Sequence, residues 1–163
     1  MTKTVGHGKT KARPKRGDAL LKTAVQTAHY EYSMFCQACV LTQRPPSPDE
    51  EHQVLRNMAI EVAVLHARNL RDFFTRKGRD DDVLAADFLR SVPPWKLTKL
   101  KSKSVRRRMN KLLAHMSFKR RRYKKGWDIP SLKAEIDRAW QMFLDRLEEE
   151  SPKVRHWFRE KGH

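Results

Sequence analysis

Residues 47–77 read SPDEEHQVLRNMAIEVAVLHARNLRDFFTRK, and this segment indicates that the chain is helical. Ser47 can cap a helix whose first position is Pro48, and Glu50 can complete a capping box. Gly78 can end the same helix. Apolar or small side chains recur every three or four residues, which predicts one buried stripe. Its members are Leu55, Met58, Ala59, Val62, Leu65, Asn69 and Phe73.

Similar periodicity predicts three more long helices, over residues 18–43, 98–118 and 128–150. Asp18 is a suitable N-cap for the first of them, and Pro130 lies in the first turn of the last. Two short helices are expected over residues 80–90 and from Ser151 onward. Four main helices joined by short loops predict an all-α, antiparallel four-helix bundle. We expect one domain over residues 18–163 and a flexible basic tail over residues 1–17.

The positive charge is concentrated in two segments. The net charge is +17, with 36 Lys and Arg against 19 Asp and Glu. Residues 1–17 hold six of these basic residues, residues 96–125 hold fourteen, and neither segment holds an acid. Solvated helix faces normally mix the two signs, so thirty residues without an acid favour binding to a polyanion, most simply RNA.

The composition argues against several other classes of protein. No run of about 18 apolar residues exists to span a membrane, and the N-terminus lacks the apolar stretch of a secretory signal. We therefore expect a soluble cytoplasmic protein without a membrane partner. Cys36 and Cys39 lack a second Cys or His pair at zinc-binding spacing, so we expect core thiols, no metal and no cofactor.

Candidate RNA-binding residues are the basic side chains between Trp95 and Trp127. They are Lys99, Lys101, Lys103, Arg106, Arg107, Lys111, Arg120, Arg121, Arg122 and Lys124. Such side chains hold phosphates with little sequence preference, whereas aromatic rings stack on bases. Trp95, Tyr123 and Trp127 could stack in this way or pack the segment against the bundle, and for Trp127 we expect packing.

Two histidines lie on predicted helices near other polar side chains. His66 and Asn69 share one face, where an otherwise apolar stripe requires that they find hydrogen-bond partners. On the later helix, Arg108 and His115 are seven residues apart, which is nearly two turns, so they also share a face. Asn110 lies between them in the sequence.

The pair Arg108 and His115 resembles the motif of HEPN (higher eukaryotes and prokaryotes nucleotide-binding) domains. That motif is an Arg, four to six residues and a His on a late helix of a four-helix bundle. HARNL at residues 66–70 and NKLLAH at 110–115 also look like segments of uncharacterised bacterial helical proteins with HEPN-like features. The family often has a polar residue after the Arg, where this chain has Met109. Asn110 is that residue only if Met109 replaces the Arg.

The resemblance implies metal-independent RNA cleavage, as in a toxin or defence protein. The 2′-hydroxyl attacks the adjacent phosphate and leaves a cyclic phosphate end. His115 would transfer the proton, Arg108 would stabilise the developing charge, and Asn110 would complete the catalytic set. The resemblance also implies a homodimer with a composite site and an antitoxin or other protein partner. Residues expected to orient the site or contact the RNA are His66, Arg68 and Asn69.

Simpler explanations of the same residues stay open. His66 and His115 could be interhelical hydrogen-bonding residues, and Arg108 could be one more member of the basic face. The chain would then be a non-catalytic module docking on nucleic acid or a ribonucleoprotein, or a subunit that binds an acidic protein. The acidic residues 80–82 are better explained by capping than by a metal, since they lie at an expected helix start.

Overall fold

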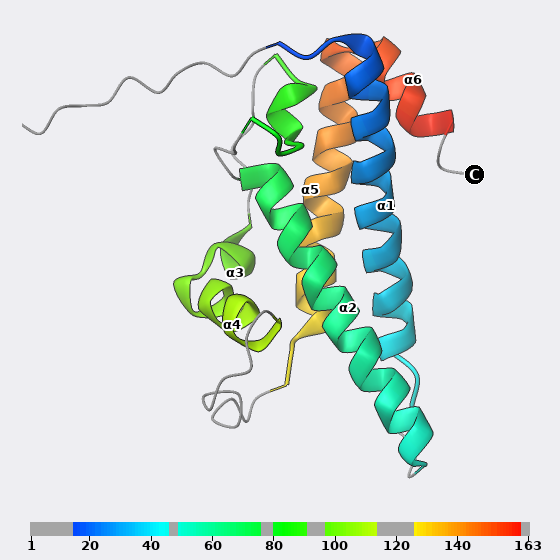
Figure 1. The fold of residues 1–163 in the computed structure, drawn as a ribbon, viewed down its shortest axis with the longest axis vertical. Coiled ribbons are helices and arrows are strands. Elements are labelled where there is room, and N and C mark those ends of the chain that lie inside the picture. The colour runs from blue at the N-terminus through cyan, green and yellow to red at the C-terminus, as the bar shows by residue number, and fades with distance from the viewer. Residues whose placement is uncertain (1–14, 46–48, 76–79, 91–96, 114–125, 161–163) are drawn as a thin grey trace, which may run out of the picture.

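The computed structural model describes residues 15–45, 49–75, 80–90, 97–113 and 126–160, with only the backbone for residues 111–113. These residues are all-helical, as predicted (Figure 1). The α-helices are α1 (Asp18–Thr42), α2 (Glu50–Thr75), α3 (Thr98–Lys101), α4 (Lys103–Leu113), α5 (Ile129–Glu150) and α6 (Pro152–Glu160). A 3-10 turn spans Ala85–Asp87. None of the described helices is long and apolar enough to cross a membrane.

Three long helices form the body of the protein. α1 and α2 run antiparallel, α5 packs against both, and α6 folds back onto α5 and α1 (Figure 1). The two short helices α3 and α4 pack on α2 and α5, on the opposite side of α2 from α1. This arrangement separates the basic helices α3 and α4 from α1.

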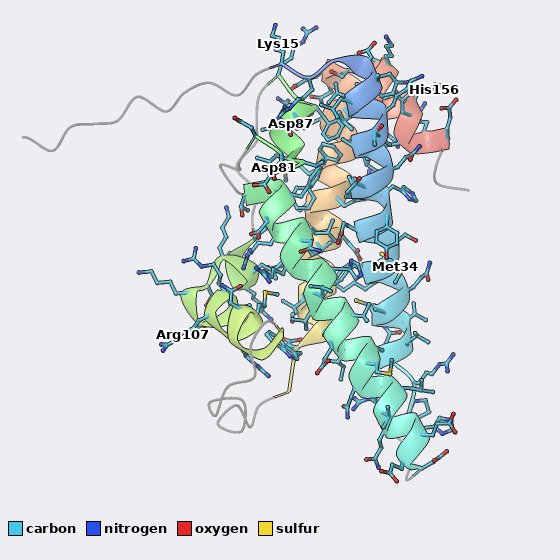
Figure 2. The ribbon with its side chains drawn as sticks, viewed as in Figure 1. Lys15, Met34, Asp81, Asp87, Arg107 and His156 are labelled. Carbon is cyan, nitrogen blue, oxygen red and sulfur yellow. The ribbon has the colours of Figure 1, made fainter. Side chains whose placement is uncertain are left out.

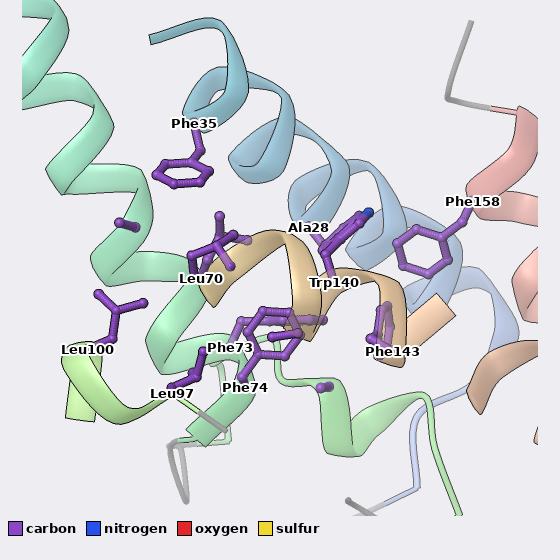
Figure 3. Packing of buried hydrophobic residues seen from close by; sticks show 14 of the residues in the cluster. Ala28, Phe35, Leu70, Phe73, Phe74, Leu97, Leu100, Trp140, Phe143 and Phe158 are labelled. Carbon is purple, nitrogen blue, oxygen red and sulfur yellow. The ribbon is translucent and has the colours of Figure 1, made fainter. Parts of the chain in front are cut away.

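An aromatic cluster fills the core between α2, α5 and α6 (Figure 3). Phe143 is fully buried, and its ring packs edge-to-face with Phe73 and Phe158, at centroid distances of 5.3 and 5.4 Å. Such geometry places the positive edge of one ring against the negative face of the next. On the α1 side, Tyr32 stacks on Trp140 at 4.3 Å.

The buried face of α2 is rotated from the predicted stripe. Leu55, Met58 and Leu65 were expected inside but are 51%, 57% and 41% exposed. Alanines allow α1 to approach α2 closely, so the small side chains mark the inner face and the larger aliphatic ones face outward. The residues that α2 buries are Ala59, Ala63, Val64, His66, Ala67, Leu70, Arg71, Phe73 and Phe74.

The short helix predicted over residues 80–90 is wrong, because only the 3-10 turn forms there. The Asp87 carboxylate accepts a hydrogen bond from the Leu84 backbone N–H at 2.9 Å, and such local bonds compete with helix formation. The helix predicted from residue 98 is also interrupted. Ser102 has a non-helical ψ of 132°, and its carbonyl accepts from the N–H of Arg106, so it stands at the N-cap position before α4. Serine is favoured at such a position.

The predicted helix starts are confirmed in part. Asp128 caps α5 by accepting from the Ser131 backbone N–H at 3.1 Å. Asp18, expected as the N-cap of α1, is instead its first residue, and its carboxylate pairs with Lys153 at 2.6 Å. The expected cap Ser47 and the expected stop Gly78 lie outside the described residues.

Candidate nucleic-acid interface

α3 and α4 present basic side chains to solvent and apolar ones to the body. Leu100 and Met109 are fully buried against α2 and α5. Figure 2 shows Arg107 on the outer side of α4, away from α2. We call the exposed set the α3–α4 basic surface. It consists of Lys99, Lys101, Lys103, Arg106 and Arg107. The other candidates, which are the side chain of Lys111 and residues Arg120, Arg121, Arg122 and Lys124, lie outside the described part.

Little acidic charge balances this surface. Lys99 pairs with Asp128 at 2.9 Å, and Lys99 and Ser131 lower the pKa of that carboxyl to about 2 by hydrogen bonding to its charged form. Among the described residues, no ion pair involves Lys103, Arg106 or Arg107. Exposed cations without local acids create a field that attracts phosphate groups.

A buried carboxylate fixes the position of α3. Glu135 of α5 is only 3% exposed. Its Oε1 accepts hydrogen bonds from the Thr98 hydroxyl at 2.8 Å and the Lys99 backbone N–H at 2.7 Å, and its Oε2 accepts from the Leu100 N–H at 3.1 Å. These bonds satisfy N–H groups that a helix start leaves without partners. The α3–α4 basic surface is therefore anchored to α5.

A second buried charge lies where α2 meets α4. The Nε and Nη2 atoms of Arg71 donate to one carboxylate oxygen of Asp72, at 3.0 and 2.6 Å. Its Nη1 lies 3.9 Å from the sulfur of Met109 on α4. Arg71 of α2 thus contacts α4, and Glu135 of α5 contacts α3.

Arg108 is separate from the α3–α4 basic surface. Its guanidinium lies 4.0 Å above the Trp127 ring, and its Nη1 donates to the Gly126 carbonyl at 3.2 Å. Trp127 therefore packs against the chain, as predicted, and a cation–π contact joins α4 to the start of α5. Asn110 is exposed on α4. His115, the predicted proton-transfer residue, lies outside the described residues.

His66 and Asn69 form a hydrogen-bonded cluster with Glu31 of α1. One oxygen of Glu31 lies 2.7 Å from His66 Nδ1 and accepts from the Asn69 amide at 3.0 Å. Tyr30 packs its ring against His66 at 5.8 Å. These contacts join α1 to α2 and support the interhelical explanation of His66. Arg68 is half-buried on the adjoining face, and no described contact joins the cluster to the Arg108 region.

Glu31 was not identified as a site residue from the sequence. A signal for it existed, since Glu31 is the only Asp, Glu, Lys or Arg between residues 23 and 43. A single carboxylate in so long an otherwise uncharged stretch of helix favours a hydrogen-bonding partner.

The two cysteines of α1 are free thiols, one buried and one half-buried. Cys39 is buried, which raises the pKa of its thiol to about 12, and burial also raises the pKa of the half-buried Cys36. Nearby, the Tyr32 hydroxyl donates to Asp137 at 3.1 Å, and Lys133 pairs with the same carboxylate at 2.6 Å. In the described ranges, no group of three or more His, Cys, Asp or Glu side chains could hold a metal ion.

No family model, no curated protein and no solved structure matches this chain. An assignment of function therefore depends on the residues and contacts described above. Chemically, they provide an exposed cationic surface, a guanidinium stacked on the Trp127 ring, and a carboxylate–imidazole–amide cluster between α1 and α2.

Proposed function

We propose that this chain binds RNA through the α3–α4 basic surface, in a HEPN-like antiparallel helical bundle. The observation that carries the proposal is the exposure of Lys103, Arg106 and Arg107 on one short helix, without acidic partners among the described residues. Side chains three and four residues apart on a helix lie about 5–6 Å from each other, so these cations act on one stretch of backbone.

The anchoring of α3 and α4 supports this proposal. Glu135 bonds to the backbone of α3 and Arg71 contacts Met109 of α4, so the backbone that carries the cations is held in place before a ligand binds. Preorganised groups lose less conformational entropy on binding than mobile ones. The HEPN resemblance favours RNA over DNA, and competition between the two polymers measures that preference.

The test is a charge reversal, Arg106→Glu with Arg107→Glu, in RNA-binding titrations at several salt concentrations. We expect strongly weakened binding. The slope of log K against log salt should fall by roughly 1.4, since each single-strand phosphate contact contributes about 0.7. A matched control is Arg138→Glu with Arg159→Glu, on α5 and α6, which changes the net charge equally. If the control weakens binding as much, overall charge explains the binding and the proposed surface is wrong.

A second candidate function is metal-independent cleavage of the bound RNA, as in a toxin or defence protein. It is favoured by the fixed guanidinium of Arg108, because a cation held in place can stabilise developing phosphate charge without reorganising. In this scheme His115 transfers the proton and Asn110 assists.

Labelled RNA incubated with chelator, with wild type and with His115→Ala, tests cleavage. Cyclic phosphate ends from the wild type alone, with equal binding by both, would support a nuclease. Salt-dependent binding by both without cleavage would eliminate the nuclease and leave a non-catalytic RNA-binding module. Arg108 is less suitable as the test residue, because its loss also removes the contact with Trp127.

A further inference from the structure

Exposed apolar side chains gather where α1 ends and α2 begins. In Figure 1 the first turns of α2 extend past the start of α5. Residues 49–58 are all exposed, and Ala59 is the first residue that α2 buries. Of the eight large hydrophobic side chains that are exposed in the described ranges, five belong to this end of the molecule. They are Val40, Leu41, Val54, Leu55 and Met58. Such a concentration marks a binding surface, since scattered single exposures are the norm.

An apolar groove of about 550 Å³ lies between these ends of α1 and α2. Ala38 and Ala59 line the groove and are buried, so their small side chains form its floor. Leu41, Leu55 and Met58 line it and stay exposed, so they form its walls. Sites for small organic molecules measure roughly 300–1,000 Å³ and are lined mainly by apolar side chains. The groove has the size and the lining of such a site.

The two ends of the groove differ in charge. Because α1 and α2 run antiparallel, Met34 (Figure 2) and Val62 line the end nearest the body of the protein, whereas Arg44 and His52 line the outer end. Arg56, which also lines the groove, lies one turn after His52 on the same face of α2. Ten residues separate Met34 from Arg44, so the two ends are about 15 Å apart at 1.5 Å per residue. One end is therefore apolar and the other cationic.

The two arginines at the outer end are available to an anion. No ion pair or side-chain hydrogen bond within the described ranges involves Arg44 or Arg56, and both are exposed. The carboxylate of Asp49 accepts from the Glu51 backbone N–H at 3.0 Å and lies 2.6 Å from His52 Nδ1, so it serves the first turn of α2. No acidic side chain of the described residues, those of that first turn included, lines the groove. Guanidinium groups hold carboxylates through strong, charge-assisted hydrogen bonds.

We propose that this groove binds a fatty-acid anion. Its carboxylate lies between Arg44 and Arg56, and its alkyl chain follows the alanine floor toward Met34. Each methylene group that leaves water for the groove stabilises the complex, and the head group stays at the exposed cationic end. The site uses other residues than the α3–α4 basic surface, so the proposal does not depend on RNA binding.

The distribution of charge favours this ligand over an acidic protein segment. An amphipathic acidic helix carries carboxylates along its whole length and would be matched by cations along both edges of the groove. The inner half of the groove, between Met34 and Val62 and the alanine floor, has no charged lining residue among those described. A ligand with one anionic head and one apolar tail matches a groove with one cationic end.

Isothermal titration calorimetry on the RNA-free chain tests the proposal, with octanoate, decanoate and dodecanoate as probes, each below its micelle-forming concentration. We expect the dissociation constant to fall about fourfold for each added methylene until the chain fills the groove, the factor that corresponds to burying one such group. Decyltrimethylammonium has the tail of decanoate and a cationic head, and it should bind at least tenfold more weakly than a carboxylate of similar chain length.

Two variants of α2 locate the site. Met58→Glu places a carboxylate on the wall of the groove and should weaken decanoate binding at least tenfold. Val54→Glu makes the same change of charge one turn away, at an exposed apolar position that does not line the groove, and should bind like the wild type. Both positions are exposed, and equal thermal unfolding of the ligand-free proteins shows that the variants fold alike.

A second pair of variants tests the head-group contact. Arg44→Gln with Arg56→Gln should remove the preference for decanoate over decyltrimethylammonium. Arg138→Gln with Arg159→Gln, on α5 and α6, lowers the net charge equally and should keep that preference.

Three results would overturn the proposal. Equal affinity of the wild type for decanoate and decyltrimethylammonium would show an apolar patch without a head-group site. Equal loss in Met58→Glu and Val54→Glu would show that net charge explains the binding. Capture of anionic vesicles or of a synthetic acidic amphipathic helix, without uptake of monomeric decanoate, would assign the groove to a membrane or a protein partner instead.

Discussion

Replacing Glu135 tests directly whether this residue holds the α3–α4 basic surface in position. Replacing Glu135 with Ala removes the acceptor for three donors at the start of α3. Hydrogen bonds to a charged group contribute about 1.5–3 kcal/mol each, but water can replace the acceptor where donors reach solvent. Thr98 and Lys99 are exposed, whereas Leu100 is fully buried. Its backbone N–H would therefore lose its acceptor in a dry environment.

Of the three hydrogen bonds, only the one from the Leu100 N–H should be lost without replacement by water. Removing the buried carboxylate also removes the free-energy cost of its desolvation, which offsets part of that loss. We therefore expect Glu135→Ala to lower the free energy of unfolding by about 3 kcal/mol, near the lower limit for breaking a buried charged contact. For a chain of this length that corresponds to roughly 10 °C in Tm. Glu135→Gln should lose about half as much, because one oxygen can still accept from Thr98 and Lys99.

Urea unfolding followed by circular dichroism measures the loss, and hydrogen exchange locates it. Exchange in α3 and in α4, which packs on α3, should accelerate while exchange in α1 stays unchanged, because the described hydrogen bonds of Glu135 go to α3 and none goes to α1. Glu149→Ala is the matched control on the same helix, since its pair with Arg146 is exposed, and it should cost less than about 0.5 kcal/mol. A loss below about 1 kcal/mol for Glu135→Ala would refute the anchoring role.

Two further predictions concern α1 and the start of α5. Tyr32→Phe removes the hydroxyl that donates to Asp137 at 3.1 Å and keeps the ring, so we expect a loss of about 1 kcal/mol in urea unfolding; an unchanged midpoint would mean that the bond contributes nothing. Asp128 has a pKa lowered from 3.8 to about 2 by Lys99 and Ser131, so its stabilising effect is present above pH 3.8 and is lost as the pH falls toward 2. An NMR titration of Asp128 should give a midpoint near 2 that moves toward 3.8 in Lys99→Ala, and a wild-type midpoint near 3.8 would contradict this cause.

Local signals predicted the helices well where capping and periodicity agreed. Asp128 with Pro130 marks the start of α5, and Pro152 marks the start of α6, because these residues act on their own turn of backbone. The all-helical class follows from the same patterns. The basic side of α3 and α4 was also predictable, since acidic residues are absent from the whole segment.

Errors arose where a neighbour decides the outcome. Leu55 and Met58 look like core residues in sequence, but α1 packs on the alanine face of α2. The predicted helix from residue 98 is interrupted at Ser102. The start of its first part, α3, is hydrogen-bonded to Glu135, which lies more than thirty residues away in the sequence. Glu31 acquires its role only because α1 lies beside His66. Periodicity within one helix contains no information about such partners.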